Sequence, residues 1–144
     1  MLIYLDICCF NRPYDDQSFP IIQLESEAKL FIQSGILNNT FDLVWSYIMD
    51  YENSVNPYTE RTKTIAKWKN LAKVDIDVSA NIVDSAKTIM TKGIKKKDAL
   101  HLACALAAKS EYFLTTDKKL LNTQLDNITI MNPLDFIRKI GDGL

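Results

Sequence analysis

The sequence has no excess of charge of either sign. Its 144 residues include 17 Lys and Arg against 18 Asp and Glu, which gives a formal net charge of -1. Bulk charge therefore cannot supply affinity for nucleic acid, and any such binding would need a local basic patch or a bound cation. The remaining composition, 47% hydrophobic and 24% charged, is that of an ordinary soluble globular domain. The length predicts a single domain over residues 1–144.

Cysteine is scarce and shows no metal-binding pattern. Cys8 and Cys9 are adjacent beside an apolar run, and Cys104 is the third cysteine. None of them has the spacing of a zinc site. The pattern favours buried free thiols in a reducing compartment.

Long apolar stretches, repeats and low-complexity tracts are also missing. No apolar run reaches membrane-spanning length, and the first residues, MLIYLD, do not form the basic-then-apolar pattern of a signal peptide. We therefore expect a cytoplasmic protein with no membrane partner.

What the sequence does contain is a succession of short apolar runs and helical segments. Strands are expected at residues 2–5, 41–45, 73–77, 112–115 and 128–131. Helices are expected at residues 21–34, 46–56, 57–72, 79–91, 97–109, 117–121 and 133–140, with a turn-rich loop at 11–16. Gly35 is expected to end the first helix, and Asn56 with Pro57 to begin the third. Strands separated by helices predict an α/β sandwich with a mostly parallel sheet, in which sites form beyond the C-terminal ends of the strands.

Acidic residues stand at four places where the chain passes from one element to the next: Asp6, Glu52, Asp98 and Asp117. Taken singly, each has an ordinary explanation, as a loop or helix cap or as a solvated helix residue. Gathered at one edge of a parallel sheet, however, carboxylates repel one another unless a cation compensates. Oxygen ligands without Cys or His partners suit Mg²⁺ or Mn²⁺ rather than zinc.

Three segments, IYLDICCFNRPYDDQ, KKKDALHLACA and YFLTTDKKLL, together resemble a PIN domain. The resemblance covers nearly the whole chain, with the fold elements in matching order. It implies a three-layer α/β sandwich, with a mainly parallel five-stranded sheet flanked by helices and an acidic Mg²⁺ or Mn²⁺ pocket that cuts RNA. Small members of the family are often VapC-type toxins, so the resemblance also implies an RNA substrate, a cognate antitoxin and a homodimer.

Carried over position by position, the resemblance places the catalytic and metal-binding acids at Asp6, Glu52, Asp98 and Asp117. Asp50 competes with Glu52 for the second place, because both lie on one short expected helix. Positions two apart on a helix face different directions, so only one of them can face the pocket. The spacing from Ser46 favours Glu52, and Asp50 is expected to meet solvent or a lysine.

One position departs from the family pattern. Ile7 follows Asp6, where the family usually has Ser or Thr. If that hydroxyl helps to hold metal or substrate, its loss would weaken catalysis unless Cys8 or Asn11 substitutes for it.

Several other residues around the expected pocket have two interpretations. The substrate-binding candidates are Arg12, Asn11, Lys97 and Thr115, and Thr115 matches the family's polar position before the last acid. Arg12 either reaches a phosphate or forms a structural ion pair, and Lys95, Lys96 and Lys97 form either a solvated face or a contact with RNA phosphates. His101 is expected to pack or hydrogen-bond as a framework residue, and Trp45 and Trp68 are expected in the core.

Other functions fit the pattern less well. A haloacid-dehalogenase-type phosphatase needs a second Asp two residues after the first, where Cys8 stands. A receiver domain needs a phospho-acceptor Asp at a central strand end, and Trp45-Ser46 offers none. The leading hypothesis is a Mg²⁺- or Mn²⁺-dependent endoribonuclease, in which metal ions activate water and stabilise the leaving oxygen. The alternative, kept open by Ile7, is a catalytically weak PIN-fold module that binds RNA or protein.

Overall fold

The computed structural model, which describes residues 1–141, contains a five-stranded sheet in the order β3-β2-β1-β4-β5. The strands are β1 (Leu2–Leu5), β2 (Asp42–Ser46), β3 (Val74–Ile76), β4 (Tyr112–Leu114) and β5 (Thr129–Met131). Every neighbouring pair is parallel. The mainly parallel five-stranded sheet expected from the sequence is therefore confirmed, and β3 lies at an edge.

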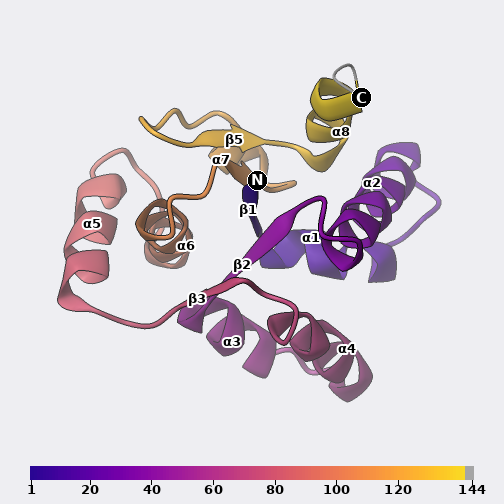
Figure 1. Cartoon of the computed structure of the whole chain (residues 1–144), viewed down its shortest axis with the longest axis horizontal. Helices are drawn as coiled ribbons and strands as arrows, with labels where there is room; N and C mark the ends of the chain where they lie inside the picture. Colours follow the sequence, from indigo (N-terminus) through magenta and orange to yellow (C-terminus); the bar gives the residue numbers. More distant parts are fainter. Residues whose placement is uncertain (142–144) are drawn as a thin grey trace.

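Helices cover the sheet on both sides. They are α1 (Ile7–Asn11), α2 (Pro20–Leu37), α3 (Tyr47–Ser54), α4 (Thr59–Lys69), α5 (Ala80–Met90), α6 (Lys96–Ala107), α7 (Lys118–Leu121) and α8 (Pro133–Gly141), with a 3-10 turn, η1 (Arg12–Tyr14). The pair α5 and α6 packs together on one side, and α1, α2 and α8 lie on the other (Figure 1). This arrangement is the predicted three-layer α/β sandwich.

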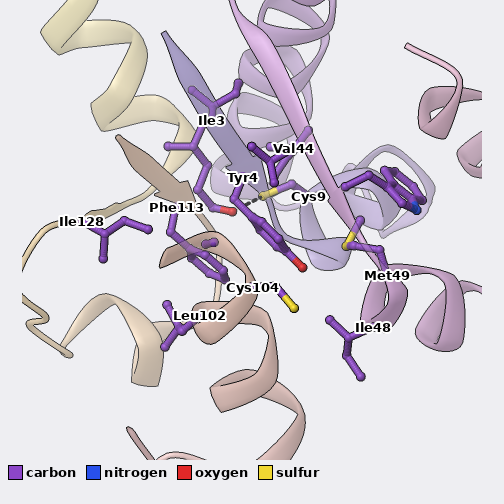
Figure 2. Close-up of a cluster of buried hydrophobic side chains, with 14 of the residues drawn as sticks. Ile3, Tyr4, Cys9, Val44, Ile48, Met49, Leu102, Cys104, Phe113 and Ile128 are labelled. Atoms are coloured by element: carbon purple, nitrogen blue, oxygen red, sulfur yellow. Dashed lines mark hydrogen bonds between the residues drawn. The ribbon is translucent and has the colours of Figure 1, made fainter. Parts of the chain in front are cut away.

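The central strand β1 is the most deeply buried element. Ile3, Tyr4 and Leu5 are all 0% exposed, as expected for a short parallel strand covered on both faces. Figure 2 shows Tyr4 beside Phe113 of β4, and the two rings stack with their centroids 5.1 Å apart. Trp45 of β2 is also fully buried, which confirms its expected place in the core.

Three boundaries differ from the sequence-based expectation. Gly35 does not end α2 but lies inside it. Glycine is needed at this position because the ring of Phe41 packs where a Cβ on residue 35 would stand. The expected loop at residues 11–16 is largely helical, since it contains the end of α1 and all of η1. Asn56 does not cap α4: its side-chain oxygen accepts a hydrogen bond from the Tyr58 amide, and the helix begins at Thr59.

Within residues 1–141, no helix combines the length and the apolar character that crossing a membrane requires.

Candidate active site

Two of the four candidate acids follow neighbouring strands. Asp6 comes directly after β1 and caps α1, accepting a hydrogen bond from the Ile7 amide, and Asp117 lies three residues beyond β4 and caps α7. Because β1 and β4 are adjacent and parallel, both acids lie at the same C-terminal edge of the sheet. Asp98 reaches this region from the first turn of α6.

Thr115 joins the two strand-end acids. Its hydroxyl donates to Asp6 Oδ2 at 2.8 Å and accepts from the Asp117 amide at 3.1 Å. Thr115 is fully buried, and both of these hydrogen-bond partners lie inside the protein. Thr115 therefore positions Asp6 and the loop that carries Asp117, and the substrate contact expected of it stays a prediction.

Ile7 has no hydroxyl to contact Asp6, but the thiol of its neighbour Cys8 makes such a contact. The Cys8 thiol donates to Asp6 Oδ2 at 3.4 Å and lies 3.5 Å from the Thr115 hydroxyl, while Ile7 packs against the core. Asn11 points elsewhere, because its side-chain amide donates to the Ile7 carbonyl. Of the two residues considered as substitutes for the missing hydroxyl, Cys8 contacts Asp6 and Asn11 does not.

Glu52 and Asp50 leave α3 in different directions. Glu52 Oε1 lies 2.6 Å from Nε2 of His101, which is on the same helix as Asp98. Asp50 instead accepts from the Trp45 indole and from Lys69, both at 2.9 Å. The lysine partner expected for Asp50 is thus present, and Glu52 is the carboxylate of α3 that turns towards α6.

A buried hydrogen-bond chain stands behind Glu52. His101 Nδ1 lies 2.6 Å from the Tyr4 hydroxyl, which in turn lies 2.6 Å from the Ser46 hydroxyl. His101 is 0% exposed, in agreement with the expected framework role. The sequence reasoning missed Tyr4, because a tyrosine in an apolar run looks like core, and it used Ser46 only to count the spacing to Glu52.

The acids influence one another electrostatically. Burial raises the pKa of the Asp98 carboxyl above its usual value, and the negative charges of Asp6, Asp117 and Glu52 raise it further. For His101, burial acts to lower the pKa, but the hydrogen bond to Glu52 and the surrounding carboxylates outweigh it, and the net direction is upward. Four elements therefore bring carboxylates close enough together to share an electrostatic field.

The donor chemistry of this region suits a hard divalent cation. The four acids offer only oxygen atoms, Asp6 is buried, and their mutual repulsion is what a bound positive charge would relieve. In the described part of the chain, however, no three His, Cys, Asp or Glu side chains are already gathered around one point as metal ligands. Binding would thus require side-chain movements that turn the carboxylates towards a common ion.

The basic residues near the site divide into two groups. Arg12 is held by two carboxylates, Glu25 at 2.9 Å and Asp15 at 3.0 Å, so it makes the structural ion pairs considered as one of its alternatives. Lys95, Lys96 and Lys97 are exposed before Asp98, and Lys97 Nζ lies 5.7 Å from the centre of the Tyr51 ring. The lysines remain available to a phosphate, whereas Arg12 would first have to leave its partners.

Comparison with known proteins supports the fold. No family model matches the sequence, and no curated protein matches it. Among solved structures, the chain is similar to the crystal structure of VapBC2 from Rickettsia felis bound to a DNA fragment from their promoter. The TM-score is 0.56 at 17% identity, over 92% of this chain and 98% of that chain. At this identity the likeness concerns the fold alone, and it identifies the five-stranded sandwich as PIN-like.

Proposed function

We propose that this protein is a Mg²⁺- or Mn²⁺-dependent endoribonuclease whose metal and catalytic acids are Asp6, Glu52, Asp98 and Asp117. The observation that carries the proposal is the placement of the acids: Asp6 and Asp117 follow adjacent parallel strands, and Asp98 reaches the same region from α6. In agreement with this placement, burial and then the charges of the other three acids raise the pKa of Asp98. Structural ion pairs also perturb carboxylates, but here no Lys or Arg within residues 1–141 forms an ion pair with any of the four.

Residues around the four acids have definite parts in this proposed function. The Thr115 hydroxyl donates to Asp6 at the end of β1 and accepts from the Asp117 amide, and the Lys119 amide of α7 donates to Asp117 Oδ1, so these bonds keep the two acids at the same edge of the sheet. A divalent cation bound among the acids supplies charge stabilisation and a more acidic water for phosphodiester hydrolysis. The exposed lysines at 95–97 lie next to Asp98 and would contact the phosphates of the bound RNA.

The partner follows from the same family resemblance. VapBC2 in the R. felis structure is bound to a DNA fragment from the promoter of its own proteins. By analogy, we propose that this chain is the toxin of a toxin–antitoxin pair, neutralised by a cognate antitoxin in the cytoplasm and assembled as a homodimer. Copurification of the chain with the product of an adjacent short gene tests this assignment, and a monomer that binds no such product contradicts it.

A PIN-fold module that binds RNA or protein without cutting is the second candidate. Two observations favour it: Ile7 replaces the usual hydroxyl, and the described residues contain no ready three-ligand metal cluster. A binding module would retain affinity for RNA after the acids are neutralised, whereas an enzyme would lose its turnover.

An assay with matched substrates separates the two candidates. The protein is incubated with an RNA oligonucleotide and with DNA of the same sequence, each with Mn²⁺ or with EDTA. Cleavage of RNA only, and only with Mn²⁺, supports the proposal. RNA that is bound but stays intact at all Mn²⁺ concentrations contradicts the enzyme and favours the binding module.

A further inference from the structure

Tyr4 belongs to the central strand β1 and its hydroxyl is buried, so leaving this polar group unpaired would be costly. Figure 2 shows this hydroxyl directed towards Cys104 of α6 and Ile48 of α3, away from its own strand. Its two hydrogen-bond partners come from these same elements: His101 lies on α6, and Ser46 is the residue that caps α3. One atom thus ties β1 to the two helices that carry Glu52 and Asp98.

The chemistry of the groups restricts how the protons are arranged. Glu52 is a carboxylate and only accepts, so Nε2 of His101 must donate to it. In the neutral imidazole, Nδ1 is then an acceptor and takes the Tyr4 proton, which leaves the Tyr4 oxygen to accept from Ser46. While the imidazole is neutral, the donors therefore run in one direction, from Ser46 through Tyr4 and His101 to Glu52, and we call this series of hydrogen bonds the relay. In the imidazolium form, Nδ1 donates to the Tyr4 oxygen instead, and the same four residues stay connected.

At the end of this series of hydrogen bonds, only one of the two oxygens of the Glu52 carboxylate is held. Glu52 Oε1 is bound by His101, whereas Oε2 has no hydrogen-bond partner among the side chains and backbone of residues 1–141. The Glu52 side chain is 20% exposed, so this second oxygen lies at the border of the site and solvent. A carboxylate held through one oxygen presents the other in a fixed direction.

We propose that Tyr4 is a positioning residue that acts through His101 to orient the free oxygen of Glu52 towards the acidic site. The proposal rests on the proposed function, in which Glu52 is one of the four metal-binding acids. Hydrogen-bond partners that orient a metal ligand typically change metal affinity or activity by about 10- to 100-fold when they are removed. Tyr4 would change metal affinity in this way although its hydroxyl contacts His101 and not the ion itself.

Tyr4→Phe removes the hydroxyl and keeps the ring stacked on Phe113. Tyr112→Phe is a matched control, because it makes the same change on the neighbouring strand, at a hydroxyl with no hydrogen-bond partner within residues 1–141. We expect Tyr4→Phe to weaken Mn²⁺ binding about tenfold and to lower kcat for RNA by a similar factor with little change in KM, while Tyr112→Phe changes each less than twofold. Equal effects of the two variants would overturn the proposal.

His101 gives a readout that does not depend on activity. It is the one histidine of the chain, so its ring nitrogens give a single set of ¹⁵N NMR signals. At a pH at which the imidazole of the parent protein is neutral, we expect Nε2 protonated and Nδ1 in the range of a hydrogen-bond acceptor, and in Tyr4→Phe we expect the Nδ1 signal to move. An Nδ1 signal that is the same in both proteins contradicts the relay, even if activity falls.

A second pair of variants applies if Tyr4→Phe does not fold. His101→Gln keeps an N–H that can reach Glu52, and His101→Leu has a similar size but no donor. We expect Gln to retain at least about ten times the Mn²⁺ affinity of Leu. Equal affinities contradict the relay. If the parent binds Mn²⁺ and these differences appear but RNA is never cut, the relay stands and the proposed enzyme activity falls.

Discussion

The environment of Asp98 opposes the ionisation of its carboxyl. It is half-buried, and its pKa is raised first by burial and then by the neighbouring carboxylates. Without a cation, the ionised form is therefore held in the folded protein at a cost. We therefore expect Asp98 to be needed for metal-dependent cleavage and, in the metal-free protein, to lower the free energy of unfolding.

We predict that Asp98→Asn raises the melting temperature of the metal-free protein at pH 7 by about 2 °C, a small value because solvent screens a half-exposed group. The sign follows from the raised pKa: the folded state binds the Asp98 proton more tightly than the unfolded state, so stability is lost as pH rises through the folded pKa. Below about pH 3.8 the carboxyl is protonated in both states, and the difference should vanish. Calorimetry in EDTA across pH tests this, and a lower melting temperature for the variant at pH 7 would contradict it.

Glu52 and Asp50 allow a direct comparison of two carboxylates on one helix. Glu52 faces His101, while Asp50 is committed to Trp45 and Lys69. We predict that Glu52→Gln lowers Mn²⁺-dependent cleavage at least about tenfold, or roughly 1.4 kcal/mol of barrier, and that Asp50→Asn changes it less than about twofold. Rates at saturating Mn²⁺ decide the matter, and the reverse ranking would move the ligand to Asp50.

At the scale of elements, α2 is unusual because it turns polar side chains inward. Glu25, Lys29 and Gln33 recur at four-residue spacing and are all buried. Glu25 has partners in Arg12 and Asn132, but Lys29 forms no ion pair within residues 1–141 and its Nζ lies 5.6 Å from the centre of the Phe10 ring. Burial lowers the pKa of Lys29 to about 8.

We predict that Lys29→Met increases the free energy of unfolding at pH 7 by on the order of 2 kcal/mol. The folded protein binds the Lys29 proton less tightly than the unfolded chain, so the penalty is fully present below about pH 8 and disappears towards pH 10.5. Urea unfolding at pH 7 measures the stability difference where the penalty is fully present, and urea unfolding at pH 10.5 measures it where the penalty has disappeared. A variant less stable than the parent at pH 7 would show that the lysine charge has a partner that the structure does not reveal.

The contact between α2 and the start of β2 leads to a further prediction. Phe41 packs on the backbone of Gly35, leaving no room for a Cβ at that position. Gly35→Ala should therefore destabilise the fold by about 1–3 kcal/mol, although alanine is the better helix former. Chemical denaturation measures the change. Gly141→Ala is a suitable control, since nothing lies within 4 Å of a Cβ there, and a stabilised Gly35→Ala would show that Phe41 yields easily.

At the scale of the whole molecule, the sequence predicted the sheet better than the connections. The strands are short apolar runs separated by helices, and this pattern is typical of buried strands in a parallel sheet. The end of α2 was predicted wrongly because glycine is ambiguous: Gly35 provides space for Phe41, which local sequence does not reveal. The helical turn of η1 was missed for a similar reason, since Arg12-Pro13 suggests a loop unless the pairing of Arg12 with Glu25 is known.

The places of the four candidate acids in the fold could be predicted from the sequence, but the contacts that support their side chains could not. Their positions after strands and at helix starts follow from local patterns, whereas the bonds of Thr115 to Asp6 and of Tyr4 to His101 join residues about a hundred positions apart. Such contacts depend on the packing of β1 against β4 and α6. One sequence alone contains no information on them.

The proposed function requires the four acids to bind a divalent cation and the protein to use it to cut RNA. In a metal add-back experiment, the EDTA-treated parent, Asp98→Asn and Asp84→Asn are titrated with Mn²⁺ while the rate of RNA cleavage is measured; Asp84 lies on the exposed face of α5. We expect Mn²⁺ to restore cleavage in the parent and in Asp84→Asn, and to leave Asp98→Asn at least about a hundredfold slower. Cleavage by Asp98→Asn at the parental rate, or parental cleavage that persists in EDTA, would contradict the proposed function.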